Sequence, residues 1–284
     1  MVSPSRIFNN ITPEEEVKRE TRTVPGMTDV SKTLFLPLFF RAQETLENGI
    51  VNDPAAVKLI HRLGYDNHNF RLDREMQLII SLRTVVLDRI VGNYIRDMRA
   101  ERHQPVIINI GAGLDTREQR FPDAVWYQVD LDAPISLRKQ YIADSNAITI
   151  AGSAFEEDWV RQVQHHDHVL VIVEGVLMYF NETMVKRFFD ILSRHFRHFG
   201  VAFDALAKRY TTVRVHQSID VNKAGFKWGI GSAKDIEDWQ MGYQAMSDYG
   251  YYQEYLNHYE HIAGRYRMIR FDATHKVYVV SHNE

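Results

Sequence analysis

One segment of the chain has the residue types and spacing of a nucleotide-binding loop. Residues Pro105–Arg117 have the sequence PVIINIGAGLDTR, a β-branched run that ends in Gly-x-Gly and continues into polar and charged residues. This pattern predicts a buried parallel strand, a tight loop and the start of a helix. Because Gly111 and Gly113 carry no Cβ, the loop backbone could approach a nucleotide-like ligand closely.

The residues after the glycines separate the possible ligand classes. A dinucleotide site favours a third glycine in G-x-G-x-x-G, whereas this chain has Thr116 there, between Asp115 and Arg117. No segment matches the phosphate-loop pattern G-x-x-x-x-G-K-[ST], which excludes that class. A Gly-x-Gly without support from its neighbours would equally fit a simple turn at the end of a strand.

Acidic residues end two further apolar runs. Asp130 closes the run 124–129, within about 20 residues of the glycine loop, where a carboxylate can accept hydrogen bonds from ribose hydroxyls. Adenosylmethionine sites and nicotinamide sites both use this contact, and a solvated loop acid is the alternative. Glu174 ends the run 168–173 and must find a partner there. Asp132 is expected to cap a helix that begins near Pro134.

The elements that would position these residues change character near residue 104. Apolar spacing predicts helices from about Asp29 to Glu47, from the Asn52-Asp53-Pro54 cap to Leu63, and over Arg71–Arg102. Beyond them, alternating patterns predict strands at 106–110, 124–129, 147–151, 168–173 and 199–204, with helices at 133–143, 156–165 and 181–196. That order is typical of an α/β fold with a parallel sheet, whose ligands bind beyond the carboxyl ends of the strands.

The chain is divided into two predicted domains. Residues 1–103 form a helical N-terminal cap, and residues 104–284 form a Rossmann-like domain with a cap insertion at about 208–240 that covers the site. A final strand at 275–281 is expected to pair antiparallel with 243–249 at the sheet edge.

Composition excludes several functional classes. The 284 residues carry a net charge of −3, which provides no basic field for nucleic acid, and no apolar run is long enough to cross a membrane. The chain has no cysteine, and its first residues lack the apolar core of a signal peptide. We therefore expect a cytoplasmic protein that binds neither nucleic acid nor membrane; the sequence carries no signal for an oligomeric state.

Several stretches between about residue 30 and residue 240 resemble, in order, the leucine carboxyl methyltransferase family. The resemblance is closest to its bacterial branch of polyketide-type O-methyltransferases, the tetracenomycin carboxyl-methylating kind. The matching stretches are Ser31-Lys32-Thr33-Leu34, Arg41-Ala42, Asp53-Pro54-Ala55-Ala56, Leu82-Arg83-Thr84, Gly111–Arg117, Val129–Asp132, Glu174–Tyr179 and Phe226–Gly229.

The resemblance implies a class I S-adenosylmethionine-dependent methyltransferase, with a mostly parallel seven-stranded sheet and no metal. It implies that Arg83 holds the methionine carboxylate, that Asp130 binds the ribose and that Glu174 lies near the methionine amino group. Without the other motifs, Arg83 would be a solvated residue of the long helix. The further cofactor residues that it implies are Lys32, Gly111, Gly113, Leu131, Ser153, Ala154 and Phe155. The chain departs from relatives at Asn109, Ala154 and Asp132, where they often have an acid, an aspartate and a proline.

The implied reaction needs an acceptor site. A carboxylate acceptor is ionised at neutral pH and needs no general base, whereas a phenol or alcohol needs one. Cationic, hydroxyl and apolar groups would hold the small-molecule acceptor. Among the residues that could do so, Tyr179 is in addition the candidate catalytic residue. The candidates are Arg41, Arg117, Met178, Tyr179, Lys227 and Trp228. His165, His166 and His168 suggest a metal cluster, but their position between a helix and a strand favours a solvated turn.

Three other functions compete with a small-molecule O-methyltransferase, whose product would be S-adenosylhomocysteine. A protein C-terminal carboxyl methyltransferase would need a groove for a chain end. A nicotinamide oxidoreductase is disfavoured by Thr116. A non-catalytic module that binds adenosylmethionine would lack transfer activity altogether.

Overall fold

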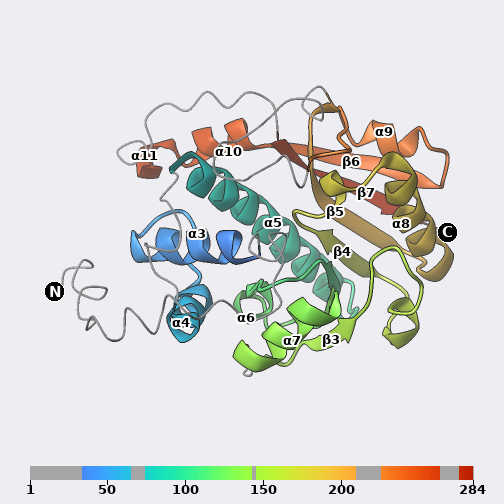
Figure 1. The fold of residues 1–284 in the computed structure, drawn as a ribbon. Helices are drawn as coiled ribbons and strands as arrows, with labels where there is room; N and C mark the ends of the chain where they lie inside the picture. Colours follow the sequence, from blue (N-terminus) through green and yellow to red (C-terminus); the bar gives the residue numbers. More distant parts are fainter. Residues whose placement is uncertain (1–33, 65–73, 143–144, 209–224, 263–274, 284) are drawn as a thin grey trace.

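A computed structural model describes residues 34–64, 74–142, 145–208, 225–262 and 275–283 of the chain. Seven strands form one sheet in the order β3-β2-β1-β4-β5-β7-β6 (Figure 1). The strand β7 runs antiparallel to its neighbours β5 and β6, and the other neighbouring pairs in the sheet are parallel. The strands are β1 (Val106–Ile110), β2 (Val125–Asp130), β3 (Ile148–Ala151), β4 (Val169–Val173), β5 (Phe199–Leu206), β6 (Tyr243–Gly250) and β7 (His275–His282). This is the mostly parallel, seven-stranded Rossmann-like sheet that the sequence predicts.

The register of the central strands brings the predicted site residues Gly111, Asp130 and Glu174 to one edge of the sheet. Ile110 at the end of β1 pairs with Val129 of β2 on one side and with Val173 of β4 on the other. The residues that follow these strand ends therefore lie next to one another. Every residue of β1 and β4 is buried, which is expected for central parallel strands covered on both faces.

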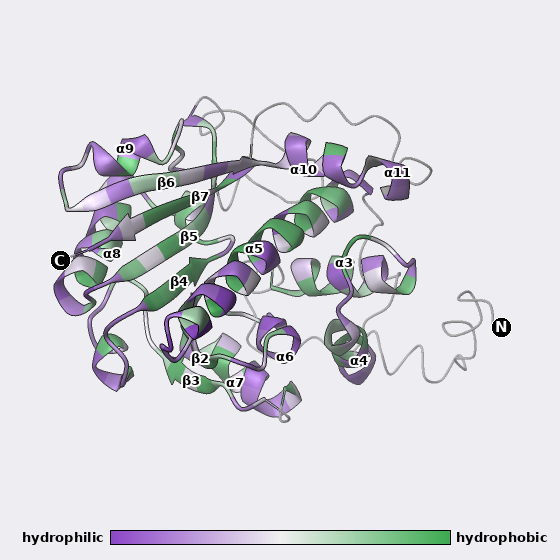
Figure 2. Ribbon diagram, turned by 180° about the vertical axis from the view of Figure 1, so that it is seen from behind, coloured by the Kyte–Doolittle hydropathy of each residue, from purple (hydrophilic) through white to green (hydrophobic). Residues whose placement is uncertain are grey.

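Helices cover both faces of the sheet, and α5 (Arg74–Ala100) is the longest of them (Figure 2). Its apolar side packs with α10 (Tyr251–Asn257) on residues such as Ile107 and Leu170. The alternate strand residues, such as Ile108 and Val171, face α8 (Glu182–His195) and α9 (Lys234–Glu237). The expected helical region thus supplies one layer directly over the sheet.

A third apolar cluster joins the N-terminal helices to the region of the glycine loop. It combines α3 (Phe35–Leu46) and α4 (Pro54–Leu63) with Leu114 and with residues of α7 (Asp132–Tyr141). The predicted cap of α4 is confirmed, because the Asp53 side chain accepts a hydrogen bond from the Ala56 amide at 3.0 Å. In the described ranges the other helices are the short α6 (Arg117–Arg120) and α11 (Tyr259–Ile262), with a 3-10 turn at Leu177–Tyr179.

Two local predictions are wrong. Residues 156–165 form turns and a single 3-10 turn at Val160–Gln162 in place of a helix. Phe155, Trp159 and Val163 are buried there, so the helix-like spacing reflects which side chains enter the core. Asp132 does not cap α7, because the helix already begins at Asp132 and Leu131 precedes it without a side-chain cap.

The antiparallel pairing of β6 and β7 is confirmed, with an irregularity between Ala245 and Ser247. Within the predicted cap insertion, residues 209–224 lie outside the described part of the chain. In the described ranges, no helix combines the length and apolar character that crossing a membrane requires. The division into two domains stays a prediction.

Candidate active site

The glycine loop folds back onto β2 through backbone conformations that favour glycine. Gly111 and Gly113 have φ values of +67° and +46°. A Cβ on Gly111 would lie 2.3 Å from Cγ2 of Val176, so this position has no room for a side chain. The Gly111 amide donates to the Val129 carbonyl at 2.8 Å. The loop is therefore closely packed, with Val176 over Gly111 and Leu34 over Gly113.

Asp130 is fixed beside this loop by two backbone amides. Its Oδ2 accepts a hydrogen bond from the Gly113 amide and its Oδ1 accepts one from the Leu131 amide, both at 2.7 Å. Burial raises the pKa of Asp130, and the two hydrogen bonds oppose that rise. Each carboxylate oxygen keeps a second lone pair, which can accept a hydroxyl donor. Leu131 beside it is 58% exposed.

Arg83 joins the ends of two strands through two carboxylates. Its Nε donates to Oε1 of Glu174 at 2.8 Å, and its Nη1 donates to Oδ2 of Asp204 at 2.9 Å. The three side chains are 13%, 11% and 1% exposed, respectively. No hydrogen bond from Nη2 of Arg83 occurs within the described ranges, so this donor can serve a ligand carboxylate.

Sequence reasoning missed Asp204, although an acid within the buried run of β5 requires a partner. Its Oδ1 accepts a hydrogen bond from the Gly175 amide at 2.6 Å, where Gly175 has φ of +69°. Burial raises the pKa of Asp204, and Arg83 opposes this. Burial also raises the pKa of Glu174, but Arg83 and Arg117 outweigh it, so that the net shift is downward. Glu174 is therefore a carboxylate at neutral pH.

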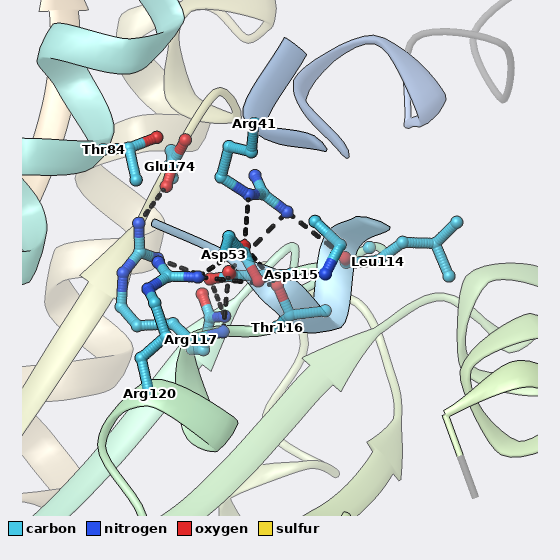
Figure 3. Close-up of polar contacts among 12 residues, drawn as sticks. Arg41, Asp53, Thr84, Leu114, Asp115, Thr116, Arg117, Arg120 and Glu174 are labelled. Carbon is cyan, nitrogen blue, oxygen red and sulfur yellow. Dashed lines mark hydrogen bonds and ion pairs between the residues drawn. The ribbon is translucent and has the colours of Figure 1, made fainter. Parts of the chain in front are cut away.

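A largely buried network of ion pairs contacts Glu174 through Arg117 (Figure 3). Arg117 is fully buried and donates to Oε2 of Glu174 at 2.9 Å, to Oδ1 of Asp88 at 2.6 Å and to Asp115. Asp88 also forms a two-pronged pair with Arg120, with both distances 2.9 Å. Sequence reasoning gave no role to Asp88 or Arg120, because pairing across distant segments leaves no local signal.

Asp53 extends the network to the N-terminal helices. It accepts hydrogen bonds from Nε of Arg41 at 3.1 Å, Nη1 of Arg120 at 2.5 Å and Oγ1 of Thr116 at 2.6 Å. Arg41 also donates to the Leu114 carbonyl at 3.3 Å (Figure 3). Arg41 and Arg117 are both buried in ion pairs. Their guanidinium groups are turned to protein carboxylates, and a contact of either with the acceptor stays a prediction.

The hydrogen bonds of Asn109 in this network explain why an amide, and not an acid, fits at this position. Its Nδ2 donates to Oδ2 of Asp115 and to Oε1 of Gln128, both at 3.0 Å. An acid at this position would place a second carboxylate against Asp115. The amide therefore fits the buried surroundings of this chain.

The acceptor candidates separate into a buried pair and a more accessible pair. The Met178 carbonyl accepts hydrogen bonds from the amides of Lys227 at 2.7 Å and Trp228 at 3.3 Å, which brings the two segments together. Met178 and Trp228 are buried in the core, and their role as apolar walls of an acceptor site stays a prediction. Tyr179 is partly buried and Lys227 is exposed.

Phe226 was not among the candidates, yet its ring centroid lies 5.3 Å from that of Tyr179. Burial raises the pKa of Tyr179, with Arg83 opposing and Asp204 adding to the shift, so the hydroxyl is protonated at neutral pH. Tyr179 can therefore donate a hydrogen bond near the Arg83 pair.

The residues expected near an adenine follow β3. The Gly152 amide donates to the Asp130 carbonyl at 2.9 Å, which holds this segment next to β2. The Ser153 hydroxyl accepts a hydrogen bond from the Phe155 amide at 3.3 Å, and Ala154 packs against the core. Phe155 is buried against Phe180, with ring centroids 4.3 Å apart. Lys32 lies outside the described residues.

The family model of leucine carboxyl methyltransferases matches residues 36–193, which is more than half of the chain. No curated protein matches the chain.

Solved structures with a similar architecture include enzymes with bound cofactor. Magnesium protoporphyrin IX methyltransferase from Synechocystis PCC 6803 with bound SAM shares 11% identity, with coverage of 92% of this chain and 100% of that chain and a TM-score of 0.48. An O-methyltransferase family protein from Burkholderia thailandensis shares 9% identity, with coverage of 74% and 60% and a TM-score of 0.45.

LepI in complex with SAM shares 10% identity, with coverage of 68% of this chain and a TM-score of 0.47. This chain spans 46% of the LepI chain. At such identities the likeness concerns general architecture and does not identify an acceptor.

Proposed function

The chain belongs to the leucine carboxyl methyltransferase family, and on that premise we propose that it methylates a carboxylate oxygen of a small, polyketide-like or aromatic acid. As a member of this family it is an S-adenosylmethionine-dependent methyltransferase. The observation that carries the proposal is the pairing of Arg83 with Glu174 and Asp204 at the same edge of the sheet as Asp130.

The residues at this edge fit the cofactor chemically. Nη2 of Arg83 would bind the methionine carboxylate, and Glu174 would accept from the methionine amino group. Asp130 would accept from the ribose hydroxyls, with Leu131 against the same face of the cofactor. The backbone of Gly111 and Gly113 would pass close to the cofactor, with Ser153, Ala154 and Phe155 on the adenine side. When bound, adenosylmethionine supplies a methyl group that is already activated by a sulfonium.

The protein's part in the transfer is alignment and exclusion of water. Tyr179 would donate a hydrogen bond to one oxygen of the acceptor carboxylate, and the exposed ammonium group of Lys227 would attract its charge. Of the described acids near Tyr179, Asp204 is paired with Arg83 and Glu174 with Arg83 and Arg117. Neither is free to act as a general base, which favours an acceptor that arrives ionised.

The test measures transfer of labelled methyl groups from adenosylmethionine to a panel of aromatic acids, phenols and a peptide that ends in leucine. We expect the aromatic acids to be labelled and the label to be released by mild base, because esters are base-labile. A base-stable product on phenols would contradict the carboxylate assignment. Labelling of the peptide alone would support a protein C-terminal methyltransferase instead. Cofactor binding without transfer to any member would favour a non-catalytic module.

The Tyr179→Phe substitution tests the acceptor side of the site. We expect the KM for the acid to rise about tenfold, as for loss of one hydrogen bond to a charged group, while the affinity for adenosylmethionine stays the same. Tyr252→Phe, which changes an exposed tyrosine of α10, is the matched control. Unchanged turnover and KM in Tyr179→Phe would remove this tyrosine from the acceptor site.

A further inference from the structure

A group of imidazole and carboxylate side chains lies at the opposite edge of the sheet from the candidate active site. Asp167 and His168 precede β4, and His198 precedes β5. One ligand atom from each of these three residues lies within 4.8 Å of the other two. We propose that Asp167, His168 and His198 form a binding site for one zinc ion or a similar divalent transition-metal ion.

The donor atoms have suitable spacing. Oδ1 of Asp167 accepts hydrogen bonds from Nδ1 of His198 at 2.8 Å and from the amides of His168 and His198 at 2.9 and 3.3 Å, and it lies 3.9 Å from Nε2 of His168. A bound ion would take the place of the proton between Asp167 and His198. Ligands about 2.0–2.2 Å from a tetrahedral zinc lie about 3.3 Å from one another, between the two observed distances from Oδ1 to the ring nitrogens. His168 and His198 are partly buried and their rings are stacked, so they would have to rotate to turn their ligand nitrogens toward one ion.

The backbone around the three ligands is held in place before any ion binds. The Val169 amide donates to the His198 carbonyl at 3.1 Å, which ties the two loops together. The Tyr94 hydroxyl donates to the His168 carbonyl at 2.7 Å and accepts from the Val106 amide at 2.9 Å. A site whose loops are already fixed loses little conformational freedom on binding.

A third imidazole, that of His103 three residues after α5, lies against this group. The His103 ring stacks on His168 with centroids 4.0 Å apart, and the His198 ring stacks on His168 at 5.1 Å. Two imidazoles and one carboxylate are donors that suit zinc, iron, nickel or copper better than magnesium or calcium. Open coordination positions would be taken by water.

The site is separate from methyl transfer. His168 and Glu174 stand at opposite ends of β4, which places them roughly 20 Å apart at about 3.3 Å per residue. The ion would join the starts of β4 and β5 and would therefore stabilise the fold. It would leave cofactor binding unchanged.

The test is calorimetric titration of the full chain, without an affinity tag, with zinc chloride, and with magnesium chloride for comparison. We expect one zinc per chain, a rise in Tm that a chelator reverses, and no effect of magnesium. The variants are His168→Asn and His198→Ala, with the exposed His61→Ala on α4 as the control. His168 has φ of +52°, a conformation that asparagine tolerates, so His168→Asn removes the ligand without straining the loop.

We expect zinc affinity to fall at least tenfold in His168→Asn and in His198→Ala and to stay unchanged in His61→Ala. Circular dichroism and adenosylhomocysteine binding report whether each variant is folded. Absence of zinc binding to the wild-type chain would overturn the proposal. Equal zinc affinity in folded His168→Asn and wild type would also overturn it.

Discussion

Arg83 is a residue whose chemistry depends on partners far away in the sequence. Burial alone would disfavour a charged guanidinium, but Glu174 and Asp204 hold the Arg83 pKa well above its ordinary value. The planar guanidinium of arginine satisfies both carboxylates and leaves a further donor, which a lysine ammonium could not do in the same geometry. The role that the family resemblance implies for Arg83 stays a prediction.

Replacement of Arg83 by lysine tests this role. Arg83→Lys keeps the positive charge but loses the forked geometry, so we expect the Kd for adenosylhomocysteine to rise tenfold or more, about 1.4 kcal/mol. Arg96→Lys, on an exposed part of the same helix, is the matched control and should bind as the wild type does. Equal affinity of Arg83→Lys and wild type would show that the guanidinium does not contact the cofactor.

At the scale of elements, apolar runs with clear ends were predictable. The strands β1, β2, β4 and β5 lie within about two residues of their predicted bounds. Of these, β1, β2 and β4 are buried runs that end at a glycine or an acidic residue, whereas β5 continues two residues beyond Asp204. The segment 156–165 was not predictable, because a chain can bury side chains at helix-like spacing through successive turns. The partners of Glu174 and Arg117 were not predictable either, since no local pattern records contacts across 57 residues.

The glycine loop provides a prediction at this scale. Gly111→Ala places a Cβ against Val176 in a left-handed conformation, so we expect a loss of about 2 kcal/mol in the free energy of unfolding and weaker cofactor binding. Gly250→Ala is the matched control, because its Cβ would meet no atom within 4 Å and its φ is −78°. Urea denaturation of both variants measures the difference. Equal stability of the two would contradict the assigned loop geometry.

At the scale of the whole molecule, the buried ion pairs connect the N-terminal helices to the sheet. Asp53 precedes α4, Arg41 lies on α3, Asp88 on α5, and Arg117 and Arg120 on α6. These elements are therefore held together by charge as well as by the apolar cluster around Leu114. A cytoplasmic location stays a prediction.

The network predicts a dependence of stability on pH. Burial raises the pKa of Asp53, but Arg120 and Arg41 outweigh it, and the net shift is downward. A carboxyl group with a lowered pKa stabilises the fold fully above its unfolded pKa of about 4, and this contribution is lost as the pH falls through the folded value. The unfolding free energy of the wild type should therefore decrease below about pH 4.

Asp53→Asn isolates this contribution. It keeps a side chain that can cap α4 but leaves Arg41 and Arg120 without their shared carboxylate, so we expect a loss of about 3 kcal/mol at pH 7. The difference between variant and wild type should shrink as the pH is lowered from 5 toward 3, measured by urea denaturation. A difference that stays constant over this range would mean that the charge of Asp53 does not stabilise the fold.

The central claim is that the strand-end site holds adenosylmethionine, and calorimetry tests it most directly. Adenosylhomocysteine, adenosylmethionine and NAD are each titrated into wild type, Asp130→Ala and the exposed control Asp132→Ala. We predict one site for the two adenosyl ligands, affinity at least tenfold weaker in Asp130→Ala and unchanged in Asp132→Ala, and no binding of NAD. Binding of NAD without binding of adenosylhomocysteine, or equal affinity in Asp130→Ala and wild type, would contradict the account.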